Sequence, residues 1–196
     1  MLLSCYNENA IEAGLDEVGR GCLAGPVVAA AVILPKAYTH PILNDSKQLS
    51  RVQREHLRTE LQRDALAWAV AEVSNEEIDR INILKASFLA MHRALDLIMQ
   101  QTDGIKPNHL LVDGNRFVNY PMIPHTCIVK GDSKFLSIAA ASVLAKTYRD
   151  ELMEKLSVEF PQYGWAQNVG YPTPFHRRAI QEHGPCPWHR MSFRLV

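Results

Sequence analysis

Four acidic side chains stand where short apolar segments of the chain end, each within two residues of a glycine; they are Asp16, Glu17, Asp113 and Asp132. Sites in α/β sheets form at strand ends and in the loops beyond them, so we expect these carboxylates to converge. Four carboxylates close together repel one another strongly and therefore require cations. Hard divalent ions such as Mg²⁺ suit oxygen ligands, and two of them about 4 Å apart would catalyse phosphodiester hydrolysis.

Each acidic motif on its own also fits an ordinary turn. An acidic pair beside glycine is common at solvated corners, and the DG of VDGN and the GD of VKGD are frequent in turns. The prediction of a catalytic site therefore rests on the joint pattern and not on any single motif.

Two glycines flank an arginine directly after the acidic pair, in the order Gly19, Arg20, Gly21. Neighbouring side chains on a strand point to opposite faces, so Asp16 and Glu17 can serve one site only if the backbone turns. Glycine allows such a turn and lets another molecule approach the main chain closely. We therefore expect the first strand to end at the acids and to enter a tight loop.

The apolar pattern predicts an α/β fold with a mixed five-stranded sheet flanked by helices. The expected strands cover residues 13–16, 27–34, 65–73, 109–112 and 126–129, the first two forming a hairpin. The expected helices are 51–64 after Ser50, a short helix opened by a Ser74–Glu77 capping box, one capped by Asn82, one over 137–155, and one between Thr173 and Gly184. In the Asn82 helix, apolar residues at helical spacing are expected in the core: Leu84, Phe88, Met91, Leu95 and Ile98.

Length and composition predict one domain with a tail. The chain has 196 residues, of which 47% are hydrophobic, and its formal net charge is zero, which counts mildly against binding nucleic acid through bulk charge. We expect a core over residues 1–159 and an extension over 160–196 that packs on it. The four cysteines form no CxxC pair, and neither a signal peptide nor a membrane-spanning run is evident, so a soluble cytoplasmic protein is expected.

Several long motifs resemble, in order and spacing, those of type 2 ribonuclease H (ribonuclease HII). They are AGLDEVGRGCLAGPVVAAAV, NDSKQLS, LLVDGN, VKGDSKFLSIAAASVLAKTYRD and YGWAQNVGYPTPFHRRAIQEHGPCPWHRMSF, and they extend from Ala13 to Phe193. The resemblance implies a ribonuclease H-like fold in which the four acids bind two Mg²⁺ or Mn²⁺ ions. It also implies an endoribonuclease that cleaves RNA paired to DNA and incises duplex DNA at single ribonucleotides, leaving 3′-hydroxyl and 5′-phosphate ends.

The same resemblance assigns the contacts to the sugar. Gly19, Arg20 and Gly21 match the family's GRG loop, which detects a 2′-hydroxyl through close backbone contact, and this hydroxyl distinguishes RNA from DNA. Tyr171 matches the tyrosine that packs on the sugar next to the ribonucleotide, which implies a preference for an RNA-to-DNA junction.

Basic and polar residues match the family's phosphate contacts. Ser46 and Lys47 belong to NDSK, while Lys146 and Arg149 stand in the motif that flanks the site. Val169 occupies a position where the family often has lysine, which implies a weaker phosphate contact.

Three alternatives remain at this stage. His183, Cys186 and His189 are spaced as HxxCxxH and could bind a transition metal, although three ligands without a fourth favour ordinary packing. A structure-selective DNA endonuclease would use the same acids without reading a 2′-hydroxyl, and a non-catalytic hybrid-binding module would tolerate their loss. We expect a monomer, with no convincing clamp-binding peptide in the final segment RMSFRLV.

Overall fold

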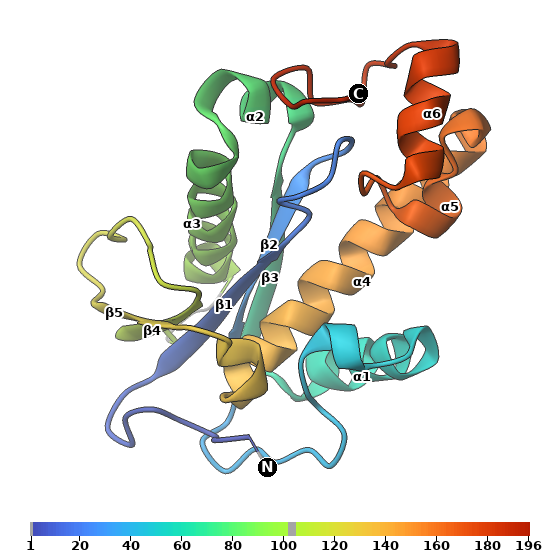
Figure 1. The fold of residues 1–196 in the computed structure, drawn as a ribbon. Coiled ribbons are helices and arrows are strands. Elements are labelled where there is room, and N and C mark those ends of the chain that lie inside the picture. The colour runs from blue at the N-terminus through green and yellow to red at the C-terminus, as the bar shows by residue number, and fades with distance from the viewer. Residues whose placement is uncertain (1, 102–104) are drawn as a thin grey trace.

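The computed structural model describes residues 2–101 and 105–196, and its centre is a mixed five-stranded sheet (Figure 1). The strands are β1 (Glu12–Val18), β2 (Val27–Ile33), β3 (Ala67–Val73), β4 (His109–Asp113) and β5 (His125–Ile128), in the order β3-β2-β1-β4-β5. β1, β2 and β3 are antiparallel neighbours, while β4 and β5 run parallel to β1. The predicted mixed sheet and its first hairpin are confirmed.

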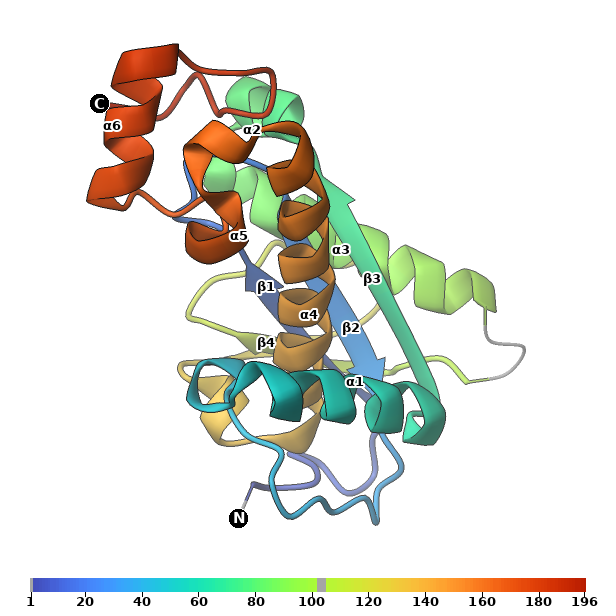
Figure 2. The ribbon, with the colours of Figure 1, turned by 90° about the vertical axis from the view of Figure 1, so that its right-hand side faces the viewer.

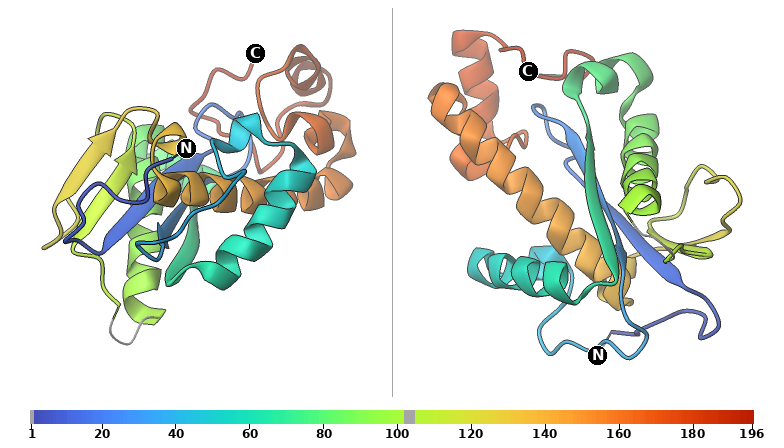
Figure 3. Two further views of the ribbon diagram at one scale, coloured as in Figure 1. Left: turned by 90° about the horizontal axis from the view of Figure 1, so that it is seen from below. Right: turned by 180° about the vertical axis from the view of Figure 1, so that it is seen from behind.

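Helices cover both faces of the sheet (Figures 1 and 2). α3 (Ile83–Gln101) packs on one face, and α4 (Leu136–Glu159) crosses β1 and β2 on the other, with α1 (Arg51–Asp64) beside it. The view from below in Figure 3 shows α4 between the sheet and α1. Two apolar clusters fill these layers, one facing α3 and one facing α4 and α1.

Local signals in the sequence account for several of these elements. Every residue of β2 is buried, as its unbroken apolar run predicts. α1 begins where expected because the hydroxyl of Ser50 accepts the N–H of Gln53 and the Gln53 side chain accepts the N–H of Ser50.

The expected capping box at the start of α2 (Asn75–Ile81) is only half formed. The hydroxyl of Ser74 accepts the N–H of Glu77 at 3.2 Å, but the Glu77 carboxylate binds the guanidinium of Arg93 at 2.8 and 2.9 Å. The ion pair with Arg93 on α3 replaces the second half of the box.

The apolar stripe of α3 lies in the core along only part of its length. Met91, Leu95 and Ile98 are buried as expected, whereas Leu84 and Phe88 are half-buried. The prediction was wrong for these two residues because they line a cleft together with residues at the ends of β1 and β4.

The C-terminal segment packs on the second half of α4. It contains the short helices η3 (Pro161–Tyr163) and α5 (Trp165–Asn168) and the predicted helix α6 (Pro174–His183). A third apolar cluster joins Leu23 and Ala24 of the loop after β1 to this segment and to α4. No helix in residues 2–101 or 105–196 combines the length and apolar character needed to span a bilayer.

Candidate active site

The strands β1 and β4 are parallel neighbours in the sheet (Figure 1). The four predicted carboxylates lie around the ends of these two strands. Asp16 and Glu17 belong to β1, Asp113 is the last residue of β4, and Asp132 lies in the short helix η2 (Gly131–Ser133) that precedes α4. The sheet therefore brings together acids that are far apart in sequence, as the parallel pairing of these strands requires.

β1 runs two residues further than expected and ends at Val18. Asp16 pairs with Ala30, which faces α4, and Glu17 pairs with Ala29, which faces α3. The backbone does not turn between the two acids, so they lie on opposite faces at the end of the strand. The site consequently extends around the end of β1.

Asp16 is the most strongly perturbed acid. Burial raises its pKa well above the usual value, and the charges of Glu17 and Asp113, and more weakly of Asp132, raise it further. A hydrogen bond with the hydroxyl of Ser142, on α4, acts in the opposite direction. The mutual effect of these charges shows that the carboxylates interact.

The other two aspartates are held by the turn around Gly131. The N–H of Gly131 donates to Asp113 Oδ1 at 2.7 Å. Burial raises the pKa of Asp132, as do the charges of Asp113 and Asp45, while Lys47 lowers it. Asp45 is thus a fifth acid near this side of the site.

Divalent cations fit this set of donors, because it offers several carboxylate oxygens that raise one another's proton affinity. In residues 2–101 and 105–196, no three His, Cys, Asp or Glu side chains already stand in an arrangement that could hold a metal ion. Glu17 Oε1 is bonded to Arg20 at 3.1 Å. Cation binding therefore involves reorienting side chains, Glu17 among them.

The short helix η1 (Ser46–Gln48) brings its residues to the Asp132 side of the site. Lys47 Nζ lies 3.7 Å from Asp132 and 3.8 Å from Asp45, and the lysine side chain remains 77% exposed. Ser46 is buried, and its hydroxyl is 2.8 Å from that of Ser142. Lys47 is thus free to meet an incoming anion, whereas Ser46 supports the site from inside.

Lys146 points away from the acidic cluster. Its Nζ binds Asp150 at 2.6 Å within α4, and both line a groove between α4 and α1. A phosphate contact by Lys146 stays a prediction.

The GRG loop contains two glycines with different surroundings. Gly19 has φ +93°, and a Cβ there would come within 2.3 Å of Arg149 Nε, so this position requires glycine. A Cβ on Gly21 would meet nothing within 4 Å. The space at Gly21 is therefore open to another molecule, as a backbone contact with a ligand requires.

Two buried arginines hold the loop between β1 and β2, of which the GRG residues are the first part, from inside the protein. Arg149 donates to the carbonyls of Ala24 and Pro26 at 3.0 and 3.1 Å. Arg190 donates to the carbonyl of Gly25 at 2.9 Å and that of Arg20 at 3.0 Å. Both side chains are fully buried, and burial lowers the pKa of Arg190 to about 10. Together they fix the loop by its carbonyl groups.

Val169 has φ +43°, which is unusual for a β-branched residue. Its carbonyl accepts a hydrogen bond from Arg149 Nη1 at 2.8 Å. The same arginine thus connects the GRG loop with the segment that leads to Tyr171.

Tyr171 lies beside the GRG loop, on the α4 side of the sheet. Its side chain is partly exposed, and burial raises its pKa, as does the nearby Cys22. Cys22 is fully buried and packs as a small side chain.

A chain of buried hydrogen bonds ends at the Tyr171 carbonyl. The N–H of Cys186 donates to His189 Nδ1, so His189 Nε2 carries the proton that it donates to His176 Nε2 at 3.2 Å. The indole N–H of Trp165 donates to the same His176 nitrogen at 3.0 Å, and His176 Nδ1 donates to the Tyr171 carbonyl at 2.9 Å. Both histidines are neutral in this arrangement and fix the backbone at Tyr171.

The three residues of the HxxCxxH motif have different surroundings, because only two of them take part in this hydrogen-bond network. His189 lies inside it, Cys186 contributes a backbone N–H, and His183 is largely exposed at the end of α6. Among the described residues these three form no metal-binding group.

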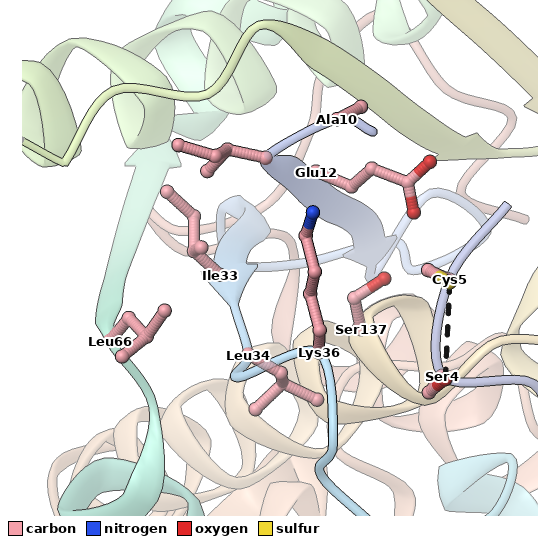
Figure 4. Close-up of a pocket in the computed structure, with 10 residues that line it drawn as sticks. Ser4, Cys5, Ala10, Glu12, Ile33, Leu34, Lys36, Leu66 and Ser137 are labelled. Atoms are coloured by element: carbon pink, nitrogen blue, oxygen red, sulfur yellow. Dashed lines mark hydrogen bonds between the residues drawn. The ribbon is translucent and has the colours of Figure 1, made fainter. Parts of the chain in front are cut away.

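A second cavity lies at the opposite end of β1 (Figure 4). Its volume is about 60 Å³, and Glu12, Lys36 and Ser137 line it. The Glu12 carboxylate accepts the N–H groups of Tyr6 and Asn7 at 2.9 and 2.7 Å. This cavity is too small for a nucleotide, and its acid anchors the N-terminal segment.

Sequence reasoning missed three residues of the site. Ser142 and Asp45 contact the acids, and Arg190 holds the GRG loop. Small serines in an apolar helix and an arginine near the C-terminus have no local signature, because their partners are distant in sequence.

Comparisons with known proteins agree on one family. A family model described as Ribonuclease HII matches residues 13–196. Ribonuclease HII of Bacteroides fragilis is 63% identical over 196 residues, covering 100% of this chain and 95% of that protein. The protein of the same name from Phocaeicola vulgatus is 61% identical, with 100% and 95% coverage.

Solved structures share the fold. The ribonuclease H2 of Pyrococcus horikoshii OT3 superposes with a TM-score of 0.76 at 27% identity, covering 94% of each chain. The RNase HII of Archaeoglobus fulgidus, solved in complex with PCNA, has a TM-score of 0.72 at 26% identity and covers 95% of this chain and 96% of that one. Bst-RNase HIII, solved with Mn²⁺, has a TM-score of 0.74 at 22% identity, covers 94% of this chain and 67% of that one, and shows the fold alone.

Proposed function

We propose a two-metal mechanism for this chain, which belongs to the ribonuclease HII family. As a member of that family it is an endonuclease that cleaves RNA in RNA–DNA hybrids and at single ribonucleotides embedded in duplex DNA. The observation that carries the mechanism is the position of Asp16, Glu17, Asp113 and Asp132 around the ends of β1 and β4. Burial and the charges of the other three acids raise the pKa of Asp16 there. These four carboxylates are the proposed ligands of two Mg²⁺ or Mn²⁺ ions.

Ions bound there would supply an activated water molecule and would stabilise charge on the departing 3′-oxygen, so 3′-hydroxyl and 5′-phosphate ends would result. In this proposal Asp16 and Asp113 would help to hold both ions, while Glu17 and Asp132 would each help to hold one. Ser142 orients Asp16, and the N–H of Gly131 orients Asp113. No side chain needs to act as a nucleophile.

The protein residues around the acids would select the substrate. The open space at Gly21 supports contact between the loop backbone and a ribose 2′-hydroxyl. Tyr171, held through His176, would pack on the next sugar and favour DNA on that side. The exposed ammonium of Lys47 would bind a phosphate near the acids.

We further propose that the protein acts as a monomer, that the segment RMSFRLV packs on the core rather than binding a clamp, and that residues 160–196 belong to the substrate-binding surface rather than to an independent domain. The packing of this segment supports its assignment to the core. Met191 and Ser192 donate to Asp79 of α2, and Phe193 and Leu195 join the apolar cluster around α4.

The mechanism is tested with duplex DNA that contains one ribonucleotide. Wild-type protein should cleave it in Mg²⁺ or Mn²⁺, and EDTA should stop the reaction. Asp113→Asn should retain the fold by circular dichroism and lose activity by about 10³-fold or more, the scale on which removal of a catalytic group acts. Cleavage of all-DNA duplex at the same rate, or full activity of Asp113→Asn in Mg²⁺, would contradict the proposal.

A further inference from the structure

A cleft of about 280 Å³ lies between the start of α3 and the turn that follows β4. We call it the α3 cleft. Leu84, Phe88 and Met91 form one wall, and Glu17 and Asp113 lie on the other side. The cleft thus opens directly beside two of the proposed metal ligands, on the face of the sheet opposite α4.

The apolar wall is held in place by its own packing. Phe88 contacts Phe117 edge to face, with ring centroids 6.0 Å apart, and Met91 is buried. Leu84 and Phe88 remain half-buried. They therefore offer a fixed apolar surface that the core does not use.

Two guanidinium groups flank the cleft. Arg20 is 51% exposed and binds Glu17, and Arg116 is exposed on the turn after β4. Within residues 2–101 and 105–196, Arg116 forms none of the ion pairs found. An exposed arginine without a carboxylate partner is suited to bidentate binding of phosphate.

The backbone on this side also leaves room for a ligand. Gly114, between Asp113 and Arg116 in the chain, has φ +109°, and a Cβ on it would meet nothing within 4 Å. Its N–H is used within the sheet, since it donates to the Ile128 carbonyl at 3.1 Å. Recognition in the cleft therefore comes from side chains, which are the apolar wall, the two arginines and the amide of Asn115.

The apolar wall and the guanidinium of Arg116 together suit a nucleotide. The C–H groups of its sugar ring can pack against the wall, and its anionic phosphate can bind the guanidinium. The volume is close to the lower limit of about 300 Å³ for small-molecule pockets. That size suits one sugar and its phosphate, with the base still paired outside the cleft.

We propose that the α3 cleft binds one nucleotide of the cleaved strand on the 5′ side of the scissile bond, with its sugar against Leu84 and Phe88 and its phosphate at Arg116. This proposal rests on the proposed function, because the direction of the strand comes from Tyr171. Tyr171 directly follows Val169 and Gly170, whose carbonyls accept hydrogen bonds from Arg149 of α4 and from the N–H of Leu23, so it lies on the α4 side. We place the DNA on the 3′ side of the scissile bond at Tyr171. The part of the strand on the 5′ side of this bond then lies toward the opposite face of the sheet, where the α3 cleft is.

The test replaces single phosphates of the substrate by neutral methylphosphonates. Duplexes with one ribonucleotide carry the neutral linkage at one position at a time, on either side of the cleavage site. Arg116→Ala should lower kcat/KM on the unmodified duplex by on the order of tenfold, as expected for one charge-assisted hydrogen bond. When the neutral linkage is at one position on the 5′ side, the kcat/KM of wild type should fall by the same factor as Arg116→Ala causes on the unmodified duplex. The kcat/KM of Arg116→Ala should not fall further at that position.

Lys106→Ala is the matched control, since Lys106 is exposed before the opposite end of β4. It should behave as wild type on every duplex. The inference is wrong if Arg116→Ala has the kcat/KM of wild type on the unmodified duplex, or if every methylphosphonate lowers the kcat/KM of Arg116→Ala as much as that of wild type. It is also wrong if the one linkage whose neutralisation does not affect Arg116→Ala lies on the 3′ side of the cleavage site. Cleavage of the unmodified duplex by wild type tests the proposed function separately. Equilibrium binding of the same methylphosphonate duplexes, measured in EDTA for wild type and Arg116→Ala, tests the inference even if no cleavage occurs.

Discussion

At Gly19 and Gly21, two glycines one residue apart have different reasons to be glycine. A side chain at position 19 would collide with Arg149, whereas position 21 faces open space. Folding therefore depends on the first glycine, and substrate contact is proposed for the second.

Gly21→Ala is expected to keep the melting temperature of wild type and to lower cleavage at a single ribonucleotide by about tenfold or more, because a methyl group would displace the ribose. Gly19→Ala is the comparison and should destabilise the protein by about 1–3 kcal/mol, the cost of a strained backbone position. Thermal unfolding and single-turnover cleavage separate the two effects. Equal losses of stability in both variants would assign Gly21 a structural role only.

The strain at Val169 gives a second prediction for a single residue. Asparagine tolerates positive φ better than valine, so Val169→Asn should stabilise the protein by about 1 kcal/mol, or about 2–4 °C in melting temperature for a chain of this size. Its carbonyl would still accept the bond from Arg149. An unchanged or lower melting temperature would show that the valine side chain contributes more by packing than its backbone costs.

Among the elements, the segment around Tyr171 depends on two neutral histidines. Burial and the neighbouring His176 lower the pKa of His189 to about 4, and burial lowers that of His176. An unfolded chain takes up these protons near pH 6.5, so the contribution of each histidine is complete above pH 6.5 and declines below it. For His189 the decline continues to about pH 4, with a slope of about 1.4 kcal/mol per pH unit for one proton.

His189→Gln keeps a donor near His176 and removes this titration. The variant should be less stable than wild type at pH 7.5, and the gap in unfolding free energy should narrow as the pH falls from 6.5 to 4. Urea denaturation at several pH values measures it, with the exposed His183→Gln as the control. A gap that stays constant with pH would show that His189 is not held neutral by the fold.

Elements defined by local signals could be predicted, and those defined by distant partners could not. α1 follows from the cap at Ser50, and β2 from its apolar run. The extra length of β1 comes from pairing with β2, and the partial exposure of Phe88 comes from the cleft that it forms with residues after β1 and β4. The same distinction applies to the site: the acids stand out in the sequence, whereas Ser142 and Arg190 have no local signature because their partners are distant in the chain.

For the molecule as a whole, zero net charge means that affinity for nucleic acid must come from a few placed cations. Lys47 is one of them. Lys47→Ala should weaken binding to all sequences alike and reduce the slope of log affinity against log salt by about one. Fluorescence anisotropy in EDTA measures the slope, with Lys106→Ala as the control. An unchanged slope would remove Lys47 from the phosphate contacts.

The hold of Arg190 on the loop after β1 also has a consequence for the order of synthesis. Arg190 follows Gly25, whose carbonyl it binds, by 165 positions. A nascent chain therefore presents the acids of β1 early but lacks one of the two arginines that hold the loop after β1 until Arg190 has been made. A ribosome-bound chain stopped before residue 190 would hold the proposed metal ligands without the loop geometry that we propose reads the ribose.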